Sequence, residues 1–152
     1  MKPGREVPIL IADDDIEDRE LIRDALEESR LLNRLIFVSD GEELMEYLQG
    51  RGRFKNREEN PLPGLILLDL NMPKKDGREA LKEIKGDTGL RKIPVVVLTT
   101  SKAEEDIART YNLGVNSFVT KPVTFDSLVA VMRDLGRYWF EIVELPVTET
   151  NP

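Results

Sequence analysis

Five short runs rich in Val, Ile and Leu alternate along the chain with longer stretches of helical periodicity, and this alternation limits the possible folds most. The runs are VPILIA, RLIFVS, GLILLD, IPVVVLT and VNSFVT, at residues 7–12, 34–39, 64–69, 93–99 and 115–120. The first, third and fourth are apolar almost throughout, a pattern typical of parallel strands that helices cover on both faces. Strict βα alternation therefore predicts a doubly wound α/β sandwich, a (βα)5 fold around a five-stranded parallel sheet.

Between the runs, apolar residues recur at helical spacing. We expect helices over residues 16–29, 42–48, 78–84 and 102–113, and a long last helix from Thr124 onward. At the start of the fourth helix, Ser101 and Glu104 have capping-box spacing, and Gly114 follows it as a residue that commonly ends a helix. The elements together are sufficient for one domain.

Charged and hydroxyl side chains stand where the strands would end. Asp13 and Asp14 follow the first run, Asp69 and Thr99 end the third and fourth, and Lys121 follows the fifth. Because the carboxyl ends of parallel strands meet at one edge of a sheet, we expect these side chains to lie together. Burying a carboxylate is unfavourable unless a cation or hydrogen bonds compensate. Three clustered carboxylates therefore predict a hard divalent cation with oxygen ligands, and Mg²⁺ fits best.

The composition argues against several classes of function. The formal net charge of −7 argues against nucleic acid as a direct partner, because that partner requires clustered Lys and Arg. No apolar run reaches the roughly 18 residues of a membrane span, and acids interrupt the short apolar segment near the N-terminus, unlike a signal peptide. The chain has no Cys and no His, which leaves carboxylates, hydroxyls and lysines for any chemistry. We therefore expect a cytoplasmic protein.

Four separated motifs resemble the receiver domain of two-component response regulators. They are DD after the first run, LLDLNMPKKDG at the end of the third, LTTS at the end of the fourth and FVTKP at the end of the fifth. The resemblance covers about residues 7 to 135 and implies a flavodoxin-like fold with strand order 2-1-3-4-5. It divides the chain into an N-terminal tail at 1–6, a receiver domain at 7–144 and a C-terminal tail at 145–152. The domain includes a loop insert at 50–63 and an extended last helix at 136–144.

The resemblance also implies how the acidic residues act. Asp69 would be the phosphoacceptor, forming an acyl phosphate by nucleophilic attack on a phosphoryl group. Asp14, Asp69 and the backbone carbonyl of Asn71 would bind Mg²⁺, and Asp13 would act mainly through water. Asn71 and Ser101 would tune the lifetime of the phosphoryl group.

Further roles follow for the residues at the ends of the last two strands. Lys121 would pair with the phosphoryl oxygens, and the Thr99 hydroxyl would bond to them. An inward movement of Thr99 would make room for Phe118, the aromatic switch residue, and would repack the fourth helix and the fifth strand. The peptide bond between Lys121 and Pro122 would be cis.

These roles favour a single-domain response regulator in phosphorelay signal transduction. It would take a phosphoryl group from a sensor histidine kinase and switch a protein-binding surface around Phe118 and the fourth helix. The LTTS motif, the loop insert and the ending RYWFEIVELP are similar to regulators that work with phytochrome-type kinases. Such a protein is not an enzyme beyond its own Mg²⁺-dependent phosphorylation and dephosphorylation.

Two other functions fit less well. A Mg²⁺-dependent phosphohydrolase with an aspartyl nucleophile would carry a second Asp two positions after the first, where this chain has Asn71. Its nucleophilic strand would also come first rather than third. A constitutive interaction module is disfavoured because the acids, Thr99 and Lys121 are all present.

The last helix carries more apolar surface than packing on a sheet requires. One stripe is expected to pack on the sheet: Phe125, Leu128, Met132, Leu135, Trp139 and Val143. Val131, Tyr138 and Ile142 widen this stripe beyond the ~100° arc of a surface helix. We expect a homodimer through this helix, unless VELPV at 143–147 folds back to cover it.

Several charged residues have simpler explanations than ligation. Asp15, Glu17 and Asp18 suit the start of a helix, and the Asp-Gly pairs at 40–41 and 76–77 are read as turn residues. The insert reads as a solvated loop. Four of its basic residues could touch an acidic surface of the kinase: Arg51, Arg53, Lys55 and Arg57.

Overall fold

The computed structural model describes residues 7–29, 33–100, 103, 106, 114–115 and 117–134. Five parallel strands form one sheet in the order β2-β1-β3-β4-β5, which confirms the expected topology. The strands are β1 (Ile9–Ala12), β2 (Leu35–Val38), β3 (Leu65–Asp69), β4 (Val95–Thr99) and β5 (Ser117–Thr120). Each lies within its predicted run, and β1, β3 and β4 are completely buried.

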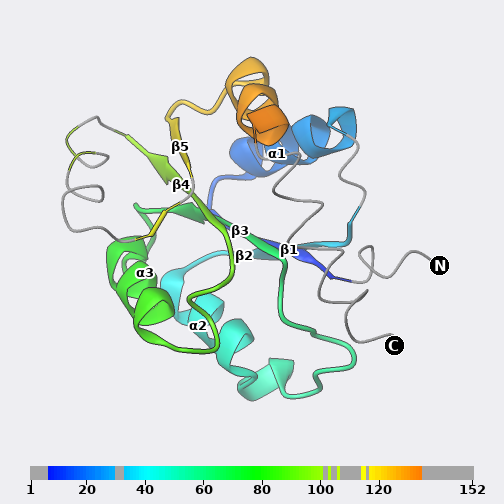
Figure 1. Cartoon of the computed structure of the whole chain (residues 1–152), viewed down its shortest axis with the longest axis vertical. Helices are drawn as coiled ribbons and strands as arrows, with labels where there is room; N and C mark the ends of the chain where they lie inside the picture. The colour runs from blue at the N-terminus through cyan, green and yellow to red at the C-terminus, as the bar shows by residue number, and fades with distance from the viewer. Residues whose placement is uncertain are drawn as a thin grey trace.

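Helices cover both faces of this sheet (Figure 1). The helices are α1 (Ile16–Glu28), α2 (Gly41–Gln49), α3 (Gly77–Gly86), a 3₁₀ turn η2 (Gly52–Phe54) and a helical segment over residues 125–134. Most of the predicted fourth helix lies outside the described residues, although Ala103 and Asp106 are helical. None of the helices in the described part of the chain is long and apolar enough to cross a membrane.

Alternating strand residues face two separate cores. Leu10 and Leu68 point to the side covered by α2 and α3, where Leu44 and Leu81 join them. Their neighbours in the strands point to the opposite side, which is covered by α1 and the segment at residues 125–134 (Figure 1). With both faces buried, the sheet exposes its polar groups mainly at the strand ends, where loops can shape a site.

Three aspartates begin the first three helices. Asp15 accepts hydrogen bonds from the N–H groups of Glu17 and Asp18, as its predicted role as N-cap requires. The side chains of Asp40 and Asp76 cap α2 and α3 in the same way. The two Asp-Gly pairs, read from sequence as turn residues, are therefore helix starts.

The loop insert is packed more tightly than its composition predicts. Phe54 is buried, and its ring meets the ring of Tyr47 edge-on at a centroid distance of 5.0 Å. The Tyr47 hydroxyl donates a hydrogen bond to the Pro61 carbonyl over 2.8 Å. The prediction of a solvated loop is therefore wrong for the centre of the insert, because α2 supplies an aromatic partner for it.

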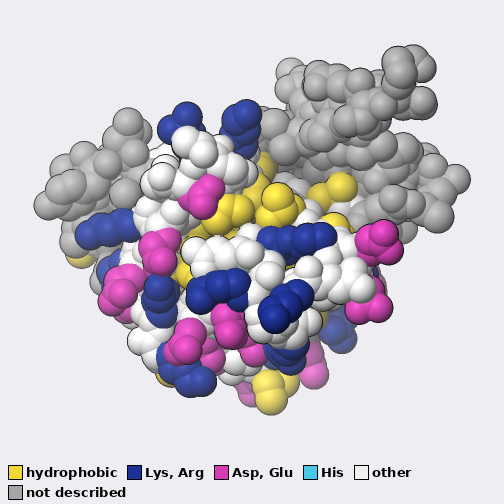
Figure 2. All heavy atoms as spheres, turned by 90° about the horizontal axis from the view of Figure 1, so that it is seen from below, with side chains coloured by type: hydrophobic (Ala, Val, Ile, Leu, Met, Phe, Trp, Pro, Cys, Tyr) yellow, Lys and Arg dark blue, Asp and Glu magenta, His cyan; other side chains and the backbone are white. Residues whose placement is uncertain are grey.

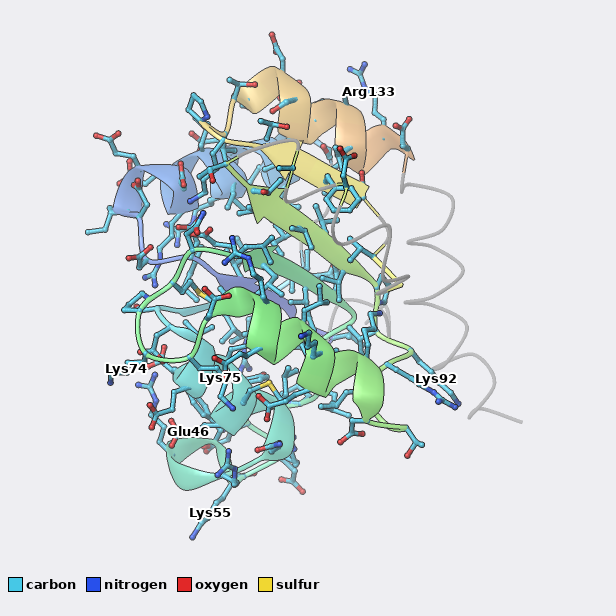
Figure 3. All side chains as sticks on the ribbon, turned by 90° about the vertical axis from the view of Figure 1, so that its left-hand side faces the viewer. Glu46, Lys55, Lys74, Lys75, Lys92 and Arg133 are labelled. Atoms are coloured by element: carbon cyan, nitrogen blue, oxygen red, sulfur yellow. The ribbon has the colours of Figure 1, made fainter. Side chains whose placement is uncertain are left out.

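Arg57 fixes the insert to the end of α2. Its guanidinium donates to the carbonyls of Tyr47, Leu48 and Asn60 over 2.8, 2.5 and 3.0 Å. Two of these carbonyls belong to the last turn of α2, where backbone oxygens otherwise lack helical partners. Arg57 is thus used inside the molecule, which corrects the expectation that it could meet a kinase, whereas Lys55 points outward (Figure 3).

The segment at residues 125–134 fits its predicted stripe only in part. Leu128 and Met132 are buried in the core, and Val129 joins them. Phe125 was expected to pack on the sheet, but it is 36% exposed. Val123, just before the helix, fills the core at this end instead. Val131, expected to widen the stripe, is half-buried and packs against the same core. The other residues of both predicted sets, from Leu135 to Val143, lie outside the described part of the chain.

Candidate functional site at the carboxyl edge of the sheet

Strand register brings the predicted acids together. β1 and β3 pair Ala12 with Leu68, so the next residues, Asp13 and Asp69, leave the sheet side by side. Both side chains are fully buried, whereas Asp14 is exposed. Carboxylate oxygens of these three aspartates lie within 4.8 Å of one another, close enough to hold one metal ion.

Lys121 joins this cluster from the loop after β5. Its Nζ lies 2.9 Å from Asp69 Oδ2 and 3.6 Å from Asp13 Oδ2. Its backbone N–H donates to the Thr99 carbonyl over 2.7 Å, which extends the pairing of β4 with β5 by one residue. The bond between Lys121 and Pro122 is cis, as the resemblance implies.

Burial sets the protonation behaviour of the acids. It raises the pKa of Asp13 from its ordinary 3.8 to about 7, although the N–H of Asp15 and the charge of Lys121 act in the other direction. Burial also raises the pKa of Asp69, against hydrogen bonds from Lys121 and the Asn71 N–H. The pKa of Lys121 is raised: burial lowers it, but hydrogen bonds to Asp18 and Asp69 outweigh that effect. The edge therefore holds buried carboxylates whose ionised forms a bound cation would stabilise.

One oxygen shows where additional positive charge is missing. Asp13 Oδ2 is buried without a hydrogen-bond partner, because Lys121 at 3.6 Å is too distant for one. Such an atom is unfavourable in a protein interior unless an ion or water meets it. The donor set consists of carboxylate oxygens, which are the ligands that hard divalent cations prefer. The cluster therefore fits a divalent metal ion.

Among the described residues, the other predicted contributors are Asn71, Thr99 and Phe118. The Asn71 backbone N–H donates to Asp69 Oδ1 over 2.9 Å, and its side chain reaches the Thr100 hydroxyl over 3.3 Å. Thr99 is fully buried at the end of β4. Phe118 is half-buried in β5 and packs against the core beneath α2 and α3. Ser101 lies outside the described residues.

Sequence reasoning missed two contributors from α1. Asp18, assigned only to the helix start, places Oδ2 2.9 Å from Lys121 Nζ. Arg19 donates from Nε to the Asp13 carbonyl over 2.6 Å and from its NH2 group to the Ser39 hydroxyl over 2.7 Å. The available signal was the short distance in sequence: a helix that begins three residues after Asp13 must start beside the site.

Comparison with known proteins agrees with this geometry. Residues 9–133 match the family described as the response regulator receiver domain. The chain belongs to this family. As a receiver, it is 44% identical over 138 residues to the response regulator Rcp1 of Synechocystis sp., and the match covers 91% of this chain and 92% of Rcp1.

Solved structures of receivers have the same fold. The bacteriophytochrome response regulator RtBRR has a TM-score of 0.78 and 47% identity, covering 86% of this chain and 78% of that one. The phosphorylated cyanobacterial phytochrome response regulator RcpA has a TM-score of 0.74 and 42% identity, covering 89% and 94%. The Mn²⁺-bound form of Rcp1 has a TM-score of 0.74 and 42% identity, covering 90% and 96%. The expected family and fold are confirmed.

Proposed function

We propose that this receiver accepts a phosphoryl group on Asp69 from a sensor histidine kinase of the phytochrome-associated type. The observation that carries the proposal is the position of Asp69 Oδ2, 2.9 Å from Lys121 Nζ and within one cluster with Asp13 and Asp14. Relatives that are themselves phytochrome response regulators, one of them phosphorylated, support the kinase class.

The transfer is a displacement at phosphorus. An oxygen of Asp69 attacks the phosphorus of a phosphohistidine, a new P–O bond forms, and the P–N bond breaks with its electron pair leaving on the imidazole. The products are an acyl phosphate on Asp69 and a histidine that takes up a proton. Since the nucleophile must be ionised, the Lys121 ammonium assists by opposing the burial that raises the pKa of Asp69.

Residues around Asp69 receive the new charge. Lys121 pairs with a phosphoryl oxygen, and the Thr99 hydroxyl, buried at the end of the neighbouring strand, donates to another. Asp14, Asp69 and the Asn71 carbonyl would hold Mg²⁺, with Asp13 acting through water. When bound, Mg²⁺ offsets negative charge on the phosphoryl oxygens.

Phosphorylation changes the binding surface because side chains near Asp69 repack. Thr99 is drawn toward the phosphoryl group, Phe118 moves into the space that it leaves, and the surface of β5 and the fourth helix changes. This regulator works in the cytoplasm through protein contacts, not nucleic acid, and pairs with a second copy through its last helix. The half-buried state of Phe118 supports its part, because the ring has room to become more buried.

Phosphohydrolase activity is the rival function. Asn71 occupies the position where such enzymes carry an acid, and its side chain is bonded to Thr100 rather than directed at Asp69. Incubation with p-nitrophenyl phosphate and Mg²⁺ separates the two functions. A receiver releases no more than trace nitrophenol, whereas an enzyme releases it over many turnovers.

Intact-mass analysis tests the proposed function directly. We expect wild type treated with acetyl phosphate and Mg²⁺ to gain one phosphoryl group, and Asp69→Asn to gain none. Asp76→Asn is the matched control, because it removes the same charge a few residues later, at a side chain that caps α3 and pairs with Arg78 in the described part of the chain. Equal labelling of wild type and Asp69→Asn would refute Asp69 as the acceptor.

A further inference from the structure

Three carboxylates share the Lys121 ammonium, and one of them lies outside the acid cluster. Asp18, in the first turn of α1, is as close to Nζ as Asp69 is, at 2.9 Å. Asp13 is farther away at 3.6 Å. The acids that could hold a metal are Asp13, Asp14 and Asp69. Asp18 is therefore a partner of Lys121 that does not belong to the candidate metal site.

The ammonium has limited donor capacity. It carries three N–H bonds, of which Asp18 and Asp69 take two at hydrogen-bonding distance, while Asp13 at 3.6 Å takes none. A phosphoryl group with several acceptor oxygens can take the remaining N–H, and a second bond from Lys121 then requires that Asp18 or Asp69 give one up.

Exposure decides which partner is released. The side chain of Asp13 is fully buried, so its carboxylate is less well solvated than an exposed one when the ammonium moves away. The side chain of Asp18 is 14% exposed, so water can solvate its carboxylate when the lysine turns away. Lys121 stays close to Asp69 in either state, because the phosphoryl group that it binds is attached to Asp69.

We propose that Asp18 is a positioning residue that competes with the phosphoryl group for Lys121 and so weakens the binding of anions at this site. The proposal rests on the proposed phosphoacceptor function. Asp18 makes no covalent bond and touches no reacting atom; it holds the ammonium until a stronger anion arrives.

Beryllium trifluoride, a stable mimic of the phosphoryl group, gives the test. We expect Asp18→Asn to bind this anion about threefold to tenfold more tightly than wild type at saturating Mg²⁺, measured by calorimetry. Labelling by acetyl phosphate should accelerate by a similar factor. Asp18→Glu keeps a carboxylate within reach of Lys121 and should restore affinity to within about twofold of wild type.

Glu17→Gln is the matched control. Glu17 is the neighbouring residue in the same turn of α1, but its side chain is exposed and makes no ion pair among the described residues. Removing its charge should leave the affinity within about 1.5-fold of wild type, since an exposed charge is screened by water and salt. A gain as large as that of Asp18→Asn would show a general charge effect and overturn the proposal.

A double-mutant cycle shows whether Asp18 acts through the lysine. In a Lys121→Met background, adding Asp18→Asn should give no further gain in affinity. A gain that persists without Lys121, or an Asp18→Asn protein that folds but binds the anion more weakly, would overturn the proposal. Asp18→Ala is a second variant in case Asp18→Asn fails to fold. If wild type itself takes up no phosphoryl group, the proposed function fails; if it does and Asp18→Asn matches it, only this inference fails.

Discussion

Lys121 and Arg57 are both half-buried cations, but they have opposite kinds of partner. Arg57 is held by three neutral backbone carbonyls, which belong to α2 and the insert. Lys121 is held by carboxylates that repel one another. The first arrangement is complete and has no reason to change, whereas the second keeps an excess of negative charge. The difference separates a cation that stabilises the fold from one that can exchange partners.

The two cations also lie in different surroundings. The insert lies beyond the last turn of α2, on a face where positive and negative side chains are interspersed (Figure 2). Lys121 lies at the carboxyl ends of the strands among buried acids. If the two cations differ in this way, substitutions near Lys121 should mainly change the rate of phosphorylation. Substitutions near Arg57 should change only the free energy of unfolding.

Replacing Lys121 is the strongest test of the claim that this cation serves phosphoryl transfer. Lys121→Met removes the cation that pairs with the phosphoryl oxygens, and we expect labelling by acetyl phosphate to slow on the order of a hundredfold. The measurement is the initial rate by intact mass at saturating Mg²⁺. Lys92→Met, at an exposed lysine before β4, is the control and should keep the wild-type rate. A wild-type rate in the Lys121 variant would remove this residue from the mechanism.

The burial of Asp13 should make stability depend on pH. Folded Asp13 keeps its proton up to about pH 7, whereas the unfolded chain releases it near 3.8, so a rise in pH between these values favours unfolding. Without divalent cations, the free energy of unfolding should fall on the order of 2 to 4 kcal/mol more in wild type than in Asp13→Asn over this range. Denaturant melts at several pH values measure this, and Mg²⁺ should reduce the fall. Parallel curves for both proteins would contradict the raised pKa.

Replacing Arg57 tests the claim that this cation stabilises the fold. Arg57→Met leaves three carbonyls without their donor, and we expect the free energy of unfolding to fall by about 2 to 3 kcal/mol. The rate of labelling by acetyl phosphate should not change. Arg53, whose side chain is 67% exposed and pairs with Glu43, is the matched residue. Arg53→Met should lose less than about 1 kcal/mol, so equal losses would show that the carbonyl contacts are not what matters.

Substitutions at two glycines of α3 test how tightly the chain is packed, one next to Asp69 and one at the far end of the helix. A Cβ on Gly77 would lie 2.4 Å from the Asp69 carbonyl oxygen, so the backbone must shift, and Gly77→Ala should lose about 1 to 2 kcal/mol of stability. A Cβ on Gly86 meets nothing within 4 Å, and Gly86→Ala should gain about 0.5 kcal/mol from the lower entropy of the unfolded chain. Chemical denaturation measures both values. A stable Gly77→Ala protein would mean that the loop after β3 can adjust.

The sequence predicted what depends on strand order along the chain, and it missed what depends on angles between elements. Asp13, Asp69, Thr99 and Lys121 could be placed together because each follows or ends a strand. The Asp18 contact depends on how α1 leaves the sheet, which no periodicity reveals. Strand alternation alone also left the order of the strands open, and the family resemblance supplied it.

The contacts of the loop insert also could not be predicted from the sequence. The positions of Phe54 and Arg57 depend on how the insert folds against α2, where Tyr47 contacts both of them. Composition reports only that such a segment is polar. Phe125 fits the helical pattern but stands in the first turn of its helix, where Val123 already fills the core.

The hydrogen bond from the Lys121 N–H to the Thr99 carbonyl has one more consequence. It ties the backbone of Thr99, at the end of one strand, to the backbone of Lys121, just after the next. The side chains can still turn, but a backbone shift at either residue would displace the other. We therefore expect the kinetics of this site to be adjusted more readily by exchanging the residues around this pair than by moving it.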